Sequence, residues 1–305
     1  MQKRIPAVYM RGGTSKGLFF HAKDLPEDPL ARDRVILAAY GSPDPENPRK
    51  PDPNRRQIDG MGGGSYTSSL LSIISPSEDP DYDLGWTFGL VSVDEPSVDY
   101  KGKSCGNIPS AVACFAIEEG MVTPVEPVTS VRILHENSGK LIIADVPIKD
   151  GRYLDEGEYA IDGVPGTGGK ITLRFSQPGG EITGKLFPTG KATDVISVPG
   201  VGDIPVSIVD AINPIVFVRA VDLGLQGTEI HEIDRSEQIR GKLEAIRGRA
   251  AVMLGMAFTP EDAARTSKDM PKIAFVSEPQ DYETVKGRMI RKKEIDMVAR
   301  IIWKG

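Results

Sequence analysis

The sequence contains few of the side chains from which metal sites and disulfides are built. Among 305 residues there are two cysteines, Cys105 and Cys114, and three histidines, His21, His135 and His231. The histidines are scattered and show no metal-ligand spacing, so we predict no metal site. The two cysteines should lie on different turns of one segment and are not expected to form a disulfide. A reduced, cytoplasmic protein is therefore expected.

Long hydrophobic runs and an excess of basic residues are also lacking. No apolar run approaches the roughly 20 residues that span a bilayer, and we expect no secretory signal at the N-terminus. Lys and Arg total 37 against 43 Asp and Glu, which gives a net charge of −6. This balance argues against binding to nucleic acid or to a membrane surface. The acidic net charge is still compatible with a locally cationic pocket that binds an acidic substrate. It is also compatible with a homo-oligomer.

Several nucleotide-binding and hydrolase motifs are missing as well. The glycine-rich stretch DGMGGGSYTSS, residues 59–69, lacks the G-x-G-x-x-G spacing of a dinucleotide site and the closing Gly-Lys-Ser/Thr of a P-loop. No G-x-S-x-G elbow occurs, although a Ser-His-Asp arrangement is not excluded by that absence. The stretch instead suits a loop that holds a carboxylate, and its residues Gly63 and Ser69 are candidates for substrate binding.

What the sequence has in quantity is glycine and proline, which number 33 and 24. They separate short β-like runs, so a turn-rich, mostly β protein with few helices is predicted. Helices are expected after the cap Asp28 up to Gly41, after Pro109, and over Ser236–Gly255. A hairpin is expected around Asn137, and Gly180–Gly190 is interpreted as β-like. Turn residues cluster most densely over Asp162–Lys170, which predicts one domain over residues 1–162 and a second over 170–305.

Cys105 is the strongest candidate for chemistry. It stands in SCGNIPSAV, just ahead of the apolar helix predicted after Pro109. Unpaired N–H groups and the positive end of a helix dipole favour a thiolate there, and the same groups can hold a substrate carboxylate. Gly106 would allow close approach of a ligand, and the Asn107 side chain could cap the helix. A buried, inert cysteine is the alternative, and it is the preferred interpretation for Cys114.

The stretch MRGGTSKGLFF, residues 10–20, is a second candidate. It offers two glycines, the hydroxyls of Thr14 and Ser15, and the cations Arg11 and Lys16 between two predicted strands. Backbone N–H groups of such a turn can bind an anion. A plain hairpin turn with solvated cations explains the composition equally well.

Taken in order, the motifs resemble those of the 2-methylaconitate isomerase (PrpF) family, which includes 3-methylitaconate Δ-isomerase and 4-oxalomesaconate tautomerase. The likeness extends from about Ile5 to Ile302 and is carried by MRGGTSKGLFF, RQIDGMGG, SCGNIPSAV, ENSGK, IDGVPGTG, LFPTG, NPIVFVRAVDLG and LEAIRGRAAVMLG. It implies an α+β, diaminopimelate-epimerase-like fold with two β-rich domains, each around a central helix. It also implies isomerisation of a small unsaturated di- or tricarboxylate without metal or organic cofactor.

The resemblance assigns roles residue by residue. The catalytic cysteine falls on Cys105, and Gly106 and Asn107 fall in the substrate-binding turn. Ser15 lies in the substrate-facing loop together with Thr14. Thr189 and Gly190 lie in the PTG turn of the second domain.

Two departures from the family accompany these matches. Leu70 stands where the family has a lysine that acts as acid or base with the cysteine, which leaves Lys16, Ser15, Ser68 and Ser69 as candidate proton carriers. The sequence also stops at WKG, where the family continues, so the second domain is expected to be incomplete before its central helix. A fragment and a partner chain that completes the domain are both compatible with this. An isomerase is the first hypothesis, and a catalytically impaired carboxylate-binding or assembly protein is the second.

Overall fold

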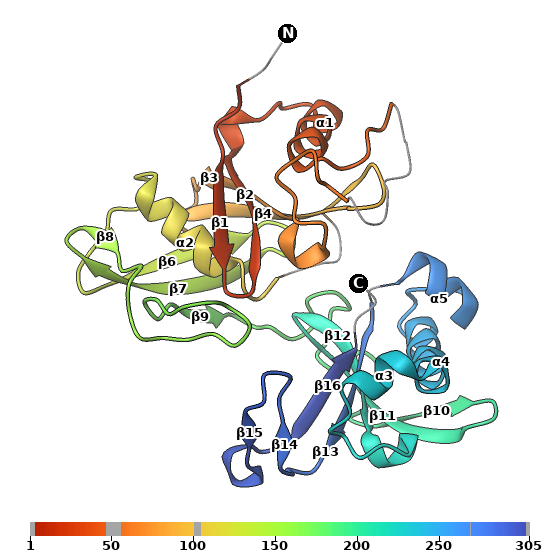
Figure 1. Cartoon of the computed structure of the whole chain (residues 1–305). Coiled ribbons are helices and arrows are strands. Elements are labelled where there is room, and N and C mark those ends of the chain that lie inside the picture. The colour runs from red at the N-terminus through yellow and green to blue at the C-terminus, as the bar shows by residue number, and fades with distance from the viewer. Residues whose placement is uncertain (1–3, 47–55, 101–104, 269, 303–305) are drawn as a thin grey trace. The chain divides into compact units, whose positions relative to one another are not determined.

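The computed structural model describes residues 4–46, 56–100, 105–268 and 270–302. The chain divides into two compact units, Met1–Gln177 and Pro178–Gly305, which are described separately below (Figure 1). The sequence placed the boundary within 162–170. The structure places it later because strand β9, Thr172–Phe175, pairs with β7, Lys140–Lys149, in the first unit.

A nine-stranded sheet forms most of the first unit. Its order is β1-β2-β3-β4-β6-β7-β8, with β5 paired to β4 and β9 to β7. The pairs β2–β3 and β4–β6 are parallel, and the hairpin predicted around Asn137 joins β6 to β7. The remaining bounds are β1 Val8–Gly12, β2 Ser15–His21, β3 Leu70–Pro76, β4 Leu84–Val91, β5 Val98–Asp99, β6 Val128–His135 and β8 Arg152–Tyr153.

Helix α2, Pro109–Glu118, lies inside this curled sheet (Figure 1). Residues Ala111–Ile117 are all buried, as expected for a helix that is apolar on every side. They share one core cluster with side chains of β2, β3, β4, β6 and β7. Pro109 occupies the first turn, where its missing N–H costs no hydrogen bond, so the helix predicted after Pro109 is confirmed.

Helix α1, Pro29–Tyr40, covers the opposite face of the same sheet. The carboxylate of Asp28 accepts a hydrogen bond from the Ala31 N–H at 2.7 Å, and Gly41 ends the helix with φ +70°. Both predicted ends are confirmed. Leu18 and Phe20, alternate residues of β2, pack against α1 and not against α2, because successive side chains of a strand point to opposite faces of the sheet. Short 3-10 helices η1, Ala22–Asp24, and η2, Tyr66–Ser68, complete the first unit.

The second unit contains a five-stranded sheet of order β10-β11-β12-β13-β16, with β12 and β13 parallel. Helix α4, Glu237–Met253, packs on it through Leu243, Ile246 and Ala250, and Ser236 caps this helix as its predicted start requires. The other bounds are β10 Asp194–Val198, β11 Gly202–Ala211, β12 Asn213–Arg219, η3 Ala220–Leu223, α3 His231–Arg235, α5 Pro260–Thr266, β13 Lys272–Ser277, β14 Tyr282–Glu283, β15 Met289–Ile290, η4 Lys292–Glu294 and β16 Val298–Ile302.

The β-like interpretation of Gly180–Gly190 is wrong. The segment forms consecutive turns, held by the fully buried Asp210 on β11. One oxygen of that carboxylate accepts hydrogen bonds from the N–H groups of Ile182 and Thr183, at 2.9 and 2.7 Å. These hydrogen bonds to a side chain take the place of the backbone hydrogen bonds that a strand would form with a neighbouring strand.

Candidate active site

The structure brings Ser15 and Cys105 together. Ser15 is the first residue of β2, and Cys105 lies four residues before the first residue of α2. The Ser15 Oγ and the Cys105 Sγ are 3.5 Å apart, within the range of a hydrogen bond to sulfur. Ser15 is 3% exposed, whereas Cys105 is half-buried and packs against the core around α2. A thiol that solvent can reach thus has a buried hydroxyl as its neighbour.

A tight hairpin turn brings Ser15 to this position. Gly12 pairs with Ser15 across β1 and β2, and Gly13 takes φ +55° between them. A Cβ at Gly12 would lie 2.8 Å from the Ile108 Cα, closer than real side chains approach. The two glycines therefore let the hairpin pack directly against the backbone that leads into α2.

Asn107 joins the two loops but does not cap the helix. Its Nδ2 donates a hydrogen bond to the Thr14 Oγ1 at 3.0 Å, and no side chain caps α2. The predicted cap is therefore wrong, since the hairpin supplies the side chain with a partner. The Asn107 carbonyl instead accepts a hydrogen bond from the Ser110 Oγ at 2.8 Å. Beside them, a Cβ at Gly106 would meet no atom of the described residues within 4 Å, so these residues leave open space beside this backbone.

Lys16 and Arg11 lie on the other side of the sheet. The two residues pair across β1 and β2, one position along from Gly12 and Ser15, so their side chains face away from Cys105. The Lys16 Nζ lies 5.7 Å from the centre of the Tyr9 ring. Lys16, one of the four candidate proton carriers, therefore does not face the Cys105 thiol.

Leu70 faces the same side of the sheet as Ser15. It begins β3 and lies opposite Gly17, two residues along β2 from Ser15. Its side chain is 5% exposed and belongs to the core around α2. The position at which the resemblance places a lysine is thus near Ser15, and it is filled here by an apolar group.

Gly63 and Ser69 are engaged within their own loop. The Gly63 N–H donates to the Ser68 carbonyl at 3.1 Å, and the buried Ser69 Oγ donates to Gln57 Oε1 at 2.6 Å. The Ser68 Oγ is 2.7 Å from the Ser65 Oγ. Contact of these residues with substrate stays a prediction. Sequence reasoning missed Gln57 as a hydrogen-bond partner of Ser69, although Gln57 lies in the motif RQIDGMGG, because the motif does not show which side chains its glutamine contacts.

Thr189 and Gly190 belong to the second unit, where they form a turn. The Thr189 Oγ1 donates to the Asp194 carboxylate at 2.6 Å, and Gly190 has φ +77°. Their contact with substrate stays a prediction.

Cys114 is buried, whereas Cys105 is half-buried. Cys114 lies within α2 and is 4% exposed. Burial, with a smaller contribution from Glu118, raises the pKa of its thiol to about 12. It is a packing residue, as the sequence analysis preferred.

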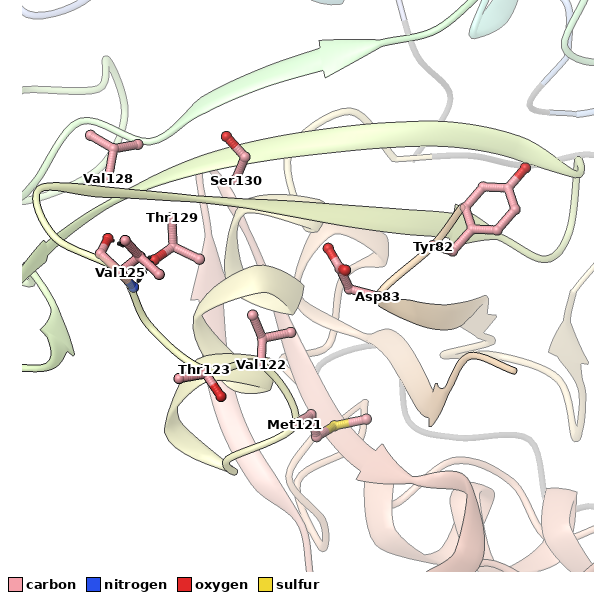
Figure 2. A pocket seen from close by; sticks show the side chains of 9 residues that line it. All are labelled: Tyr82, Asp83, Met121, Val122, Thr123, Val125, Val128, Thr129 and Ser130. Atoms are coloured by element: carbon pink, nitrogen blue, oxygen red, sulfur yellow. Dashed lines mark hydrogen bonds between the residues drawn. The ribbon is translucent and has the colours of Figure 1, made fainter. Parts of the chain in front are cut away.

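A cavity of about 530 Å³ lies at the opposite end of α2. Figure 2 shows its lining, which includes Asp83, Met121, Val122 and Thr129. The ten residues of α2 separate it from Cys105 by about 15 Å. Asp83 forms an ion pair with Arg132 at 2.6 Å, and none of the predicted site residues lines the cavity, so we assign the chemistry to the Cys105 end.

Among the described residues, no group of three or more His, Cys, Asp or Glu side chains is placed to hold a metal ion. None of the helices formed by these residues is long and apolar enough to cross a membrane.

A curled sheet around a buried helix, with a cysteine just ahead of that helix, defines a protein of the predicted α+β, diaminopimelate-epimerase-like class. The chain belongs to the PrpF family, described as "PrpF protein", which it matches over residues 2–305. The resemblance inferred from the motifs is thereby confirmed.

Relatives of this chain carry isomerase names. The chain is 44% identical to 3-methylitaconate isomerase of Eubacterium barkeri, over 99% of this chain and 77% of that protein. It is 38% identical to 2-methyl-aconitate isomerase of Shewanella oneidensis, over 100% of this chain and 77% of that protein. It is also 38% identical to 4-oxalomesaconate tautomerase of Pseudomonas putida, over 94% of this chain and 74% of that protein. The crystal structure of a methylitaconate-delta-isomerase superposes with a TM-score of 0.83 at 44% identity, over 99% of this chain and 76% of that one.

Proposed function

We propose that this protein is an isomerase that moves a proton across the allylic system of a small unsaturated di- or tricarboxylate. Methylitaconate, 2-methylaconitate and 4-oxalomesaconate are the candidate substrates, because relatives at 38–44% identity are named for them. The observation that supports this most is the Ser15–Cys105 pair at the N-terminal end of α2. In the proposal Cys105 is the catalytic base.

The reaction begins with the Cys105 thiolate, which removes a proton from the carbon next to a carboxylate. The S–H bond forms, the C–H bond breaks, and its electron pair enters a dienolate. The same thiol then returns the proton. Return at the other allylic carbon shifts the double bond, whereas bond rotation followed by return at the same carbon gives the cis–trans isomer. No electrons are gained or lost overall, and acid–base catalysis of this kind contributes about 10²–10⁴-fold.

Ser15 and the backbone ahead of α2 supply the remaining interactions. The Ser15 hydroxyl, 3.5 Å from Sγ, donates a hydrogen bond to the thiolate and holds it in position. N–H groups at the start of a helix stabilise developing negative charge, and the open space beside Gly106 lets a carboxylate approach them. Thr14 and Asn107, which are hydrogen-bonded to each other, supply further polar groups in the two loops that contain Ser15 and Cys105.

One observation favours the second function, a carboxylate-binding or assembly protein without turnover. Leu70 places an apolar group on the face where an ammonium would support the thiolate. Binding through N–H groups and hydroxyls would survive this change, whereas proton transfer would lose a cationic neighbour.

The two functions are separated by incubating the protein with each of the three acids and following isomer formation by proton NMR. Isomerisation of at least one acid is the expected result. Binding detected by calorimetry without isomerisation of any acid would contradict the isomerase proposal and favour the binding protein.

A further inference from the structure

Gln57 is a buried polar residue that the proposed chemistry does not use. Its side chain is 3% exposed, and its backbone has φ +56°, a conformation that costs energy for any residue with a side chain. Such a conformation persists where surrounding contacts over-determine it. We propose that Gln57 is a positioning residue of the Cys105 site, acting through the glycine loop, which we define as Gly62–Ser69.

The amide of Gln57 holds two separate points of the glycine loop. Its Oε1 accepts a hydrogen bond from the Gly64 N–H at 3.0 Å and another from the Ser69 Oγ at 2.6 Å. Its Nε2 donates to the Ser42 Oγ at 3.0 Å. Ser42 in turn donates to the Ser92 carbonyl at 2.7 Å. The loop is thus tied through one amide to the chain just after α1 and to the end of β4.

The loop also closes around this amide with no space to spare. A Cβ at Gly62 would lie 2.2 Å from Gln57 Oε1. The Gly62 N–H donates to the Tyr40 carbonyl at 3.1 Å, which brings the loop against the last residue of α1. The loop therefore folds around the Gln57 side chain, and removal of that side chain leaves the buried Ser69 hydroxyl and the partly buried Gly64 N–H without their acceptor.

From the glycine loop the contacts lead to the proposed base. Helix η2, which the loop contains, packs against β2, the strand that Ser15 begins. Tyr66 of η2 packs against the same core cluster as Cys105. A shift of the loop therefore changes the surroundings of the Ser15–Cys105 pair without any contact between Gln57 and substrate.

The test compares Gln57→Met and Gln57→Gly with Gln177→Gly. Methionine keeps the length and volume of the side chain but not its hydrogen bonds, and glycine relieves the strained φ. Gln177 is the matched control because it has φ +52° and an exposed side chain. The first readout is the rate of Cys105 alkylation by iodoacetamide as a function of pH, which needs no substrate. The second is kcat and KM for the isomerisation, and only this readout rests on the proposed function.

Both Gln57 variants are expected to change the alkylation rate of Cys105 several-fold and to lower kcat by about tenfold or more, whereas Gln177→Gly leaves both unchanged. Gln57→Glu, which keeps the acceptor for Gly64 and Ser69, should recover much of the loss. Ser42→Ala, a milder change, should act in the same direction. If the Gln57 variants do not fold, Ser42→Ala alone tests whether this hydrogen-bond chain positions the Cys105 site.

Folded variants whose Cys105 reactivity and kcat match those of the control would overturn the inference and leave Gln57 a purely structural residue. The same conclusion follows if Ser42→Ala lowers thermal stability alone. If the unsubstituted protein isomerises none of the three acids, the proposed function fails, and the alkylation comparison still decides the role of Gln57.

Discussion

The hydroxyl of Ser15 and the thiol of Cys105 lie 3.5 Å apart although 90 positions separate them in the chain. One is at the start of a strand and the other just ahead of the central helix, and a glycine turn closes the distance between them. With Lys16 on the opposite face of the sheet and Leu70 in the core, Ser15 is the polar side chain that the described structure places against the proposed base.

Ser15→Ala should lower the rate of isomerisation by about 10- to 100-fold, because a hydrogen bond to a charged group contributes about 1.5–3 kcal/mol. The loss should appear in kcat, with the fold retained in circular dichroism. Ser130→Ala is the matched control, since Ser130 donates to Asp145 at an exposed position on β6. Equal rates for the two variants would remove Ser15 from the mechanism.

Leu70→Lys should raise the rate by about tenfold or more and shift the alkylation of Cys105 to lower pH, because a nearby ammonium favours the thiolate. It should also cost stability, since a cation replaces a core side chain. Leu90→Lys is the control, because Leu90 is the partner of Leu70 on β4 and is similarly buried. It should destabilise the protein without raising the rate. A rate that is unchanged in Leu70→Lys would show that position 70 does not reach the site.

Cys114 should resist alkylation under native conditions while Cys105 reacts. Its pKa of about 12 leaves a thiolate fraction on the order of 10⁻⁴ at pH 8. Mass spectrometry of peptides from protein treated with iodoacetamide checks this. Modification of Cys114 at a rate comparable to that of Cys105 would mean that α2 is not buried as described.

The same raised pKa predicts how stability depends on pH. The folded thiol of Cys114 titrates far above the value of about 8.5 for an unfolded cysteine. The stability it contributes is therefore complete below pH ~8.5 and is lost as the pH rises toward 12. Urea unfolding of the unsubstituted protein and of Cys114→Ala should show a difference in free energy of unfolding that shrinks above pH 9. A difference that is constant from pH 7 to pH 10.5 would contradict this.

Tyr40→Phe should reduce the free energy of unfolding by about 1–3 kcal/mol. The fully buried Tyr40 hydroxyl donates to the Leu70 carbonyl and accepts a hydrogen bond from the Leu18 N–H, and phenylalanine leaves both groups unsatisfied. Tyr82→Phe, at a partly exposed position, serves as the control. A change below 0.5 kcal/mol in urea unfolding, as is usual at surface positions, would show that the pair of hydrogen bonds is not needed.

Local signals explain which parts of the fold were predictable. Asp28 and Gly41 define α1 by themselves, because a carboxylate cap and a left-handed glycine act within one turn of the helix. Pro109 and the apolar run after it define α2 in the same way. The motif SCGN ahead of that helix also made Cys105 the strongest candidate for chemistry, and the family resemblance added its catalytic role.

Contacts between distant residues decided the rest. The β-like interpretation of Gly180–Gly190 failed because a carboxylate from β11, that of Asp210, folds the segment into turns. Asn107 was predicted to cap the helix, but its side chain instead donates a hydrogen bond to Thr14 of the neighbouring hairpin turn. The direction of Lys16 depends on strand register, in which a shift of one residue reverses the face.

The central claim, that Cys105 transfers the proton, is tested most directly by deuterium incorporation from D₂O into methylitaconate, 2-methylaconitate or 4-oxalomesaconate. The protein should exchange the allylic proton of at least one acid, Cys105→Ser should reduce this exchange by at least about 10²-fold, and Cys114→Ser should retain it in the folded fraction. Exchange that persists in Cys105→Ser, or that is lost equally in both variants, would contradict the assignment of Cys105 as the base.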